Sequence, residues 1–309
     1  MAHKEEFYYL STSGTTKIHG VRYIPDGEIR AILQISHGMV EYIERYEAFA
    51  SFLNSNGILV TGNDHLGHGK SINSKEDWGY FAENDGNRAV LYDLHQLTQI
   101  TKEKYPNIPY FLLGHSMGSF YARQYLCEFG KELDGAIIMG TGCQPFALVQ
   151  FGVVLTKVIS LFKGWKYRCN FINNLAFGSY NRHFEPARTT KDWLSKDTAI
   201  VDKYVTDECC NFIFTLNAYH NMFRGISRLY NKQLLFNMPK DLPVFFVAGE
   251  DDPVGDYGKG VKKAFDMFKN AGMKNVKLKL YPNDRHEILN ETDRSQVYDD
   301  LYSWLNALI

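Results

Sequence analysis

Short apolar runs alternate with amphipathic stretches along the first half of the chain, which is the pattern of strands followed by helices. Strands are predicted, in chain order, over residues 6–10, 17–24, 31–36, 58–62, 110–113 and 135–139. Helices are predicted between them over residues 45–56, 83–105 and 119–129. Because parallel strands are joined by long crossovers that are usually helical, this alternation indicates an α/β fold with parallel pairing.

The segment over residues 142–241 interrupts the alternation with aromatic-rich sequence that favours helices. A strand, a helix, a strand and a last helix are then predicted over residues 242–248, 259–270, 276–281 and 295–309. Since the strand pattern resumes after the interruption, we predict one α/β core formed by residues 1–141 and 242–309, with residues 142–241 inserted as a cap.

Composition and charge narrow the class of protein. With 309 residues, 45% hydrophobic, 22% charged and a formal net charge of -1, the chain is typical of a soluble globular protein, and no nucleic-acid partner is expected. The N-terminal residues lack the apolar segment of a secretory signal, which predicts a cytoplasmic protein. The five cysteines include the adjacent Cys209 and Cys210 and no C-x-x-C motif, which favours reduced thiols over a disulfide framework or a zinc site. No metal or cofactor is expected.

The sequence Gly114-His-Ser-Met-Gly118 matches the Gly-x-Ser-x-Gly pattern of a nucleophile elbow. In such an elbow a strained turn between a strand and a helix exposes the serine hydroxyl, and the flanking glycines allow backbones to approach closely. The pattern alone is common, but here an apolar strand precedes it and a predicted helix follows it. Ser116 is therefore the candidate nucleophile.

A serine nucleophile needs a histidine base and a carboxylate that fixes the histidine tautomer, and in this architecture they follow in the order Ser, acid, His. His286 comes shortly after the last predicted strand and is the candidate base. The acid is expected after the strand over residues 242–248, where Glu250, Asp251 and Asp252 form a run of three carboxylates. Position alone leaves all three as candidates.

Acyl transfer also builds negative charge on the carbonyl oxygen, which backbone N–H groups stabilise. One donor is expected from Met117, directly after the nucleophile, and the other from Met39, in the turn after the third predicted strand. We expect the same turn and the elbow to contact substrate through His37, Gly38 and His115.

Residues 146–162 form an apolar stretch long enough to span a membrane. A single crossing there would place Ser116 and His286 on opposite sides of the bilayer, so we predict no span. The stretch is instead expected to be a buried or pocket-lining helix of the cap, in which Phe146 and Phe151 contact an acyl chain. Shallow membrane contact through the cap is an alternative.

These motifs resemble those of the α/β-hydrolase family of monoacylglycerol lipases and lysophospholipases, whose domain is also labelled serine aminopeptidase-like. The matching motifs are His37-Gly-Met-Val-Glu41 with Arg45-Tyr46, Asp64-His-Leu-Gly-His-Gly69 with Ser71, Gly114-His-Ser-Met-Gly118, Gly249-Glu-Asp-Asp-Pro-Val254 and His286-Glu-Ile-Leu-Asn-Glu291. They span nearly the whole chain outside the cap. One residue departs from the pattern, since Leu66 stands where the family usually carries arginine, which affects loop packing rather than chemistry.

The resemblance implies an α/β-hydrolase fold, with a mostly parallel eight-stranded sheet flanked by helices and an inserted helical lid. It implies Ser116, Asp252 and His286 as the catalytic triad, with Asp252 chosen because the family's acid precedes Pro-Val. It also implies Met39 and Met117 as the oxyanion hole.

Together these features predict a serine hydrolase that cleaves carboxylic esters through an acyl-serine intermediate, with a monoacylglycerol or a lysophospholipid as substrate. A small aryl or short-chain carboxylesterase is one alternative, and an aminopeptidase or amidase is another. An aminopeptidase needs a carboxylate that holds the substrate ammonium, and the candidates in the cap are Glu185, Asp192, Asp197, Asp202, Asp207 and Glu208. A non-catalytic binding protein of the same fold is disfavoured, because every triad position is filled.

Overall fold

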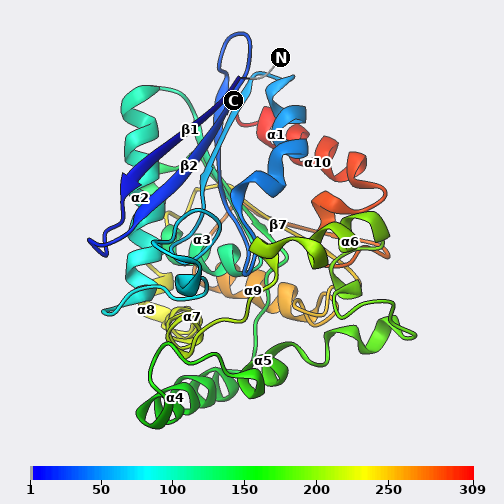
Figure 1. Cartoon of the computed structure of the whole chain (residues 1–309). Coiled ribbons are helices and arrows are strands. Elements are labelled where there is room, and N and C mark those ends of the chain that lie inside the picture. The colour runs from blue at the N-terminus through cyan, green and yellow to red at the C-terminus, as the bar shows by residue number, and fades with distance from the viewer. Residues whose placement is uncertain (1–2) are drawn as a thin grey trace.

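An eight-stranded sheet runs through the centre of the computed structural model, which describes residues 3–309 (Figure 1). The strands cover, in chain order, His3–Leu10 (β1), Lys17–Ile24 (β2), Ala31–Ser36 (β3), Ile58–Asn63 (β4), Tyr110–His115 (β5), Gly135–Met139 (β6), Val244–Gly249 (β7) and Val276–Tyr281 (β8). Their order across the sheet is β1-β2-β4-β3-β5-β6-β7-β8. β2 pairs antiparallel with β1 and with β4. From β4 onward, the neighbouring strands β4, β3, β5, β6, β7 and β8 pair in parallel. The predicted mostly parallel α/β sheet is confirmed.

Helices cover both faces of the sheet. The helices outside the predicted cap are Glu47–Asn54 (α1), Gly86–Lys104 (α2), Met117–Glu128 (α3), Lys259–Asn270 (α9) and Arg294–Asn306 (α10). Apolar residues of α1 and α10 form one core with the sheet, and those of α2, α3 and α9 form another on the opposite face. Every residue of β3 to β7 is therefore buried, as expected of parallel strands covered on both faces.

Short 3-10 helices supplement these elements. They cover Ile43–Tyr46, Lys75–Asp77, Gly130–Glu132, Tyr180–Phe184, Asp192–Leu194, Glu208–Cys210 and Ile288–Asn290. The helix predicted over residues 45–56 thus begins as a 3-10 turn at Ile43 and becomes α-helical only at Glu47.

Five α-helices lie between β6 and β7 in the chain, within the predicted cap. They are Phe146–Lys163 (α4), Asn170–Phe177 (α5), Thr198–Thr206 (α6), Leu216–Arg228 (α7) and Lys232–Leu235 (α8). α4 lies at the end of the molecule opposite both termini (Figure 1) and packs along α7. The two helices approach closely because α4 has a glycine at its contact with α7: a Cβ at Gly152 would lie 2.8 Å from the Phe223 ring.

The prediction that α4 is a buried or pocket-lining helix holds for only one of its faces. Val149, Gly152, Thr156 and Ser160 are buried, whereas large apolar side chains on the other side are exposed. By length and composition alone, α4 could cross a membrane, and 22% of it is buried in the protein. Its exposed face therefore needs an explanation other than core packing.

Candidate active site

Ser116 lies on a strained turn at the junction of β5 and α3. Its φ of 53° and ψ of -117° place it in a backbone region that residues with side chains rarely adopt. A Cβ at Gly114 would lie 2.4 Å from the carbonyl oxygen of Gly118, and one at Gly118 would lie 1.9 Å from that of Ser36. Both glycines are therefore required by the close packing of α3 against β5 and β3.

His286 and Asp252 form a buried hydrogen-bonded pair at the same edge of the sheet. His286 Nδ1 lies 2.9 Å from Asp252 Oδ2, and the side chains are 2% and 0% exposed. The other carboxylate oxygen of Asp252 accepts a hydrogen bond from the Val254 N–H at 2.8 Å. Of the three candidate acids, Asp252 alone is bonded to the His286 ring in the described part of the chain, because Glu250 and Asp251 have no hydrogen bond to it.

The turn after β3 lies directly against Ser116. A Cβ at Gly38 would lie 3.1 Å from Ser116 Cβ, and the Gly38 N–H donates to the Glu41 carboxylate. Met39 follows in this turn, and Met117 is the first residue of α3, where backbone N–H groups have no partner within the helix. Met39 and Met117 line the same cavity as Ser116.

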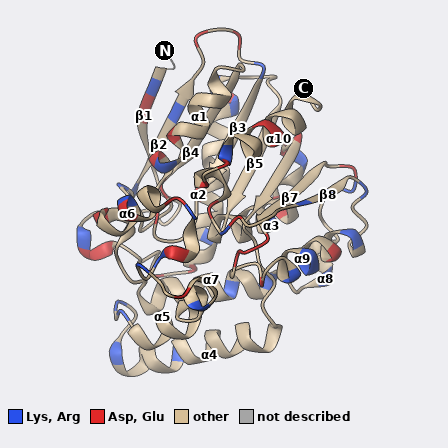
Figure 2. Cartoon of the chain, turned by 90° about the vertical axis from the view of Figure 1, so that its right-hand side faces the viewer, with Lys and Arg blue, Asp and Glu red and all other residues tan. Residues whose placement is uncertain are grey.

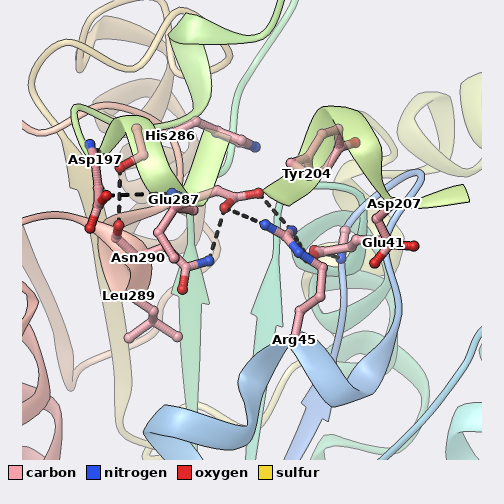
Figure 3. Close-up of polar contacts among 12 residues, drawn as sticks. Glu41, Arg45, Asp197, Tyr204, Asp207, His286, Glu287, Leu289 and Asn290 are labelled. Atoms are coloured by element: carbon pink, nitrogen blue, oxygen red, sulfur yellow. Dashed lines mark hydrogen bonds and ion pairs between the residues drawn. The ribbon is translucent and has the colours of Figure 1, made fainter. Parts of the chain in front are cut away.

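A buried charge network joins the turn after β3 to the loop after β8 (Figure 3). Arg45 donates two hydrogen bonds of 2.7 Å to the carboxylate of Glu287 and one of 2.8 Å to Glu41 Oε2. Glu41 Oε1 accepts from the Tyr46 hydroxyl at 2.9 Å and lies 3.0 Å from His115 Nδ1. The network thus links the segments that carry the candidate oxyanion donors, nucleophile and base.

Burial and charge act in opposite directions on the pKa values in this network. Burial favours the neutral form of Glu41, but the hydrogen bond from His115 and the charges of His115 and Arg45 hold the pKa of its carboxyl well below its usual range. Burial also works to lower the pKa of His115, but the Glu41 carboxylate offsets this, and the pKa of His115 is raised. Glu41 and His115 therefore favour a charge-assisted hydrogen bond.

A cavity of about 200 Å³ lies in front of Ser116 and is also lined by His286. Helices α4, α5 and α7 supply much of its apolar wall, including Leu148, Val149, Phe151, Ile172, Phe223 and Ile226. An apolar cavity with a few polar groups at one end is typical of a small-molecule site.

Three of the five residues predicted to contact substrate line this cavity, namely Gly38, His115 and Phe151. His37 is buried behind the turn, where its Nε2 accepts from the His65 N–H at 2.8 Å and its ring centroid lies 4.2 Å from that of His65. Phe146 is half exposed at the start of α4, with its ring centroid 5.3 Å from that of Tyr230. His37 and Phe146 thus lie outside the cavity lining.

The buried histidines behind the turn are electrically neutral at pH 7. Burial lowers the pKa of His65 to about 4 and that of His68 to about 3, and it lowers the pKa of His37 well below its usual range. Within residues 3–309, no group of three or more His, Cys, Asp or Glu side chains could hold a metal ion. These histidines are packing residues of the turn.

Several residues around the cavity were not assigned a role from the sequence. Three of them, Glu41, Arg45 and Glu287, lie within the motifs named above. Their charges, close in sequence to the turn after β3 and to His286, are the sequence feature from which a role could have been predicted. Lys191 and Trp193 line the cavity from the predicted cap, where no motif marks them. The Trp193 ring centroid lies 5.1 Å from that of His286.

Comparison with known proteins gives consistent similarities. A family model described as serine aminopeptidase, S33, matches residues 27–293. Monoglyceride lipase of Homo sapiens is 25% identical over 301 residues, which cover 91% of this chain and 84% of that protein. Monoacylglycerol lipase of Mycolicibacterium smegmatis is 26% identical over 315 residues, which cover 98% and 97%.

The structure of a thermostable carboxyl esterase from Bacillus coagulans, in complex with glycerol, superposes with a TM-score of 0.92 at 30% sequence identity. The match covers 100% of this chain and 99% of that chain. The similarity therefore includes the inserted helices as well as the sheet.

Proposed function

The chain belongs to the serine aminopeptidase S33 family and is a carboxylic ester hydrolase, and from that premise we propose that it hydrolyses monoacylglycerols or lysophospholipids with Ser116 as nucleophile. The observation that carries the proposal is that Ser116, on its strained turn, and the buried pair of His286 and Asp252 line or flank one end of an apolar cavity. Relatives named monoglyceride lipase support the choice of lipid esters.

In the proposed first step, the Ser116 hydroxyl attacks the ester carbonyl while His286 Nε2 takes its proton. Asp252 accepts the hydrogen bond from His286 Nδ1, which leaves Nε2 free as the base and stabilises the imidazolium that forms. The carbonyl oxygen becomes an oxyanion, for which the N–H groups of Met39 and Met117 are the donors.

The tetrahedral intermediate then collapses to an acyl-serine, and His286 gives its proton to the leaving alcohol. In the second half of the cycle, water attacks the acyl carbonyl, His286 takes the water proton, and Ser116 regains its hydrogen as the carboxylic acid leaves. Each step uses only groups of this chain, the substrate and water.

The charge inside the cavity favours an ester over an aminopeptidase substrate. An aminopeptidase needs an unpaired carboxylate for the substrate ammonium, but none of the six candidate carboxylates of the cap lines the cavity. Glu41 and Glu287 do line it, and both are bonded to Arg45. The alternative of a short-chain or aryl esterase uses the same catalytic groups and differs only in how much of the apolar wall the acyl chain covers.

The exposed face of α4 supports shallow contact with a lipid surface as part of the proposed function. Leu161 is 74% and Phe162 83% exposed at the end of α4, and the helix carries two lysines and no acidic residue (Figure 2). Because α4 also lines the cavity, a lipid surface at this face would bring the ester close to the site.

Hydrolysis of p-nitrophenyl esters from acetyl to palmitoyl, together with a monoacylglycerol and lysophosphatidylcholine, tests the proposal. We expect activity to peak at medium or long acyl chains and to be lost in Ser116→Ala, and an intact-mass adduct with a fluorophosphonate to form in the wild type alone. Activity confined to acetyl and butyryl esters would favour the short-chain esterase. Equal activity of the Ser116→Ala variant would overturn the assigned nucleophile.

A further inference from the structure

Lys191 is an unpaired cation at the edge of the active-site cavity. It precedes the 3-10 helix Asp192–Leu194, and it lines the cavity together with Trp193 and Tyr204. Its side-chain nitrogen lies 5.8 Å from the centroid of the Tyr204 ring. Within residues 3–309, this side-chain nitrogen makes no hydrogen bond to a protein group and no ion pair with a carboxylate.

The two carboxylates that line the cavity with this lysine, Glu41 and Glu287, are already engaged. Both oxygens of Glu287 accept hydrogen bonds from Arg45 at 2.7 Å, and one of them also accepts from Asn290 at 2.9 Å. Glu41 is bonded to Arg45 as well. The charge of Lys191 is therefore available to a molecule in the cavity.

Lys191 belongs to the segment that packs against His286, the residue that would protonate the leaving alcohol. In the proposed reaction His286 protonates the leaving oxygen, and the Trp193 ring is tilted by 42° against the His286 ring, with the ring centroids 5.1 Å apart. The backbone N–H of His286 donates to the backbone carbonyl of Trp193 at 3.4 Å, so the segment that begins with Lys191 is bonded to the loop that carries His286. The apolar wall from α4, α5 and α7 is left for the acyl chain.

We propose that Lys191 binds an anionic substituent, such as a phosphate group, on the alcohol half of the ester, so that the enzyme favours acyl glycerol phosphates over neutral monoacylglycerols. This inference rests on the proposed function and names the class of alcohol that the same site selects. An ammonium and a phosphate form a strong charge-assisted hydrogen bond when both are partly removed from water. Burial lowers the pKa of Lys191, and an anion bound beside it would stabilise its charged form.

The test compares octanoylglycerol with octanoylglycerol phosphate as substrates of the same acyl chain. The measured quantity is the ratio of kcat/KM for the phosphorylated ester to that for the neutral ester. We expect Lys191→Met to lower this ratio about tenfold or more and Lys191→Arg to retain most of it. Lys203→Met is the matched control, because Lys203 is an exposed cap lysine that does not line the cavity, and we expect it to leave the ratio unchanged.

An unchanged ratio in Lys191→Met would overturn the inference. If that variant were also less stable, the lysine would only offset the charge of Glu41 and Glu287. Hydrolysis of octanoylglycerol without hydrolysis of its phosphate by the wild type would also overturn it, while leaving the proposed function intact. Failure of the wild type to hydrolyse either ester would overturn the proposed function as well.

Discussion

Arg45 holds the carboxylate of Glu287 in a buried bidentate ion pair, with both N–H···O distances at 2.7 Å, and Glu287 is the residue directly after His286 (Figure 3). Two parallel hydrogen bonds fix the direction of a carboxylate as well as its distance. Since Arg45 also bonds Glu41 in the turn that carries Met39, it ties the loop of the candidate base His286 to the turn of the candidate oxyanion donor.

We therefore expect Arg45→Lys to lower kcat about tenfold to a hundredfold with a smaller change in KM, because a lysine keeps the charge but not the bidentate geometry. Steady-state kinetics on a p-nitrophenyl ester measure this split. Arg188→Lys is the control, since the pair of Arg188 and Asp202 is exposed and neither residue lines the cavity. An unchanged kcat in Arg45→Lys would contradict a positioning role for the pair.

The hydrogen bond between Asp252 and His286 gives a second prediction. Asp252→Asn would favour the wrong tautomer of the imidazole, so we expect kcat to fall by about a thousandfold or more while the protein stays folded. Glu250→Gln and Asp251→Asn are matched controls, because neither carboxylate is bonded to His286. A large loss of activity in either control, with a small loss in Asp252→Asn, would move the acid to that residue.

The sheet could be predicted well from the sequence because its strands are buried on both faces and therefore read as short apolar runs. The strand at Lys17–Ile24 and the helix at Lys259–Asn270 have the same limits in the prediction and in the structure. The sequence does not predict the 3-10 turn that begins the helix expected over residues 45–56. This turn depends on contacts such as the hydrogen bond from the Ile43 N–H to Asp64. Leu66, which departs from the family pattern, is buried in the apolar core.

The candidate site was predictable where a local motif fixes the geometry. The backbone of Ser116 is dictated by the glycines on either side of it, which a sequence displays directly. Three neighbouring carboxylates could not be separated by sequence spacing, because only the three-dimensional course of the loop brings Asp252 to His286. Lys191 could not be found at all, since its role depends on cap residues that meet the core across the cavity.

The buried histidine His68 predicts a specific loss of stability in acid. Its ring lies among Phe81, Phe212 and Phe214, its Nε2 has no hydrogen-bond partner among the described residues, and burial lowers its pKa to about 3. In the unfolded chain the pKa is about 6.5. Between these values the unfolded state binds more protons, so this histidine's contribution to stability is fully present above pH 6.5 and is lost as the pH falls toward 3.

The free energy of unfolding of the wild type should fall as the pH is lowered from 7 to 5. Because phenylalanine cannot titrate, we expect that of His68→Phe to fall by about 2 kcal/mol less. Urea unfolding at both pH values measures the difference. His65 remains in both proteins, so its own titration cancels in the comparison. Equal losses in the two proteins would mean that His68 is solvated or charged in the folded state.

The apolar end of α4 gives the last prediction. Burying Leu161 and Phe162 in a lipid surface removes two large side chains from water, and each contributes about 1.5 to 3 kcal/mol when fully buried. We expect the double variant Leu161→Ser and Phe162→Ser to bind phosphatidylcholine vesicles about tenfold or more weakly in co-sedimentation, with unchanged hydrolysis of soluble p-nitrophenyl acetate. Tyr8→Ser is the control, because Tyr8 is 53% exposed on β1, away from α4. Equal vesicle binding by the double variant and the wild type would exclude this end of α4 as the contact. Weaker vesicle binding by Tyr8→Ser would show that exposed apolar side chains contribute to binding wherever they lie.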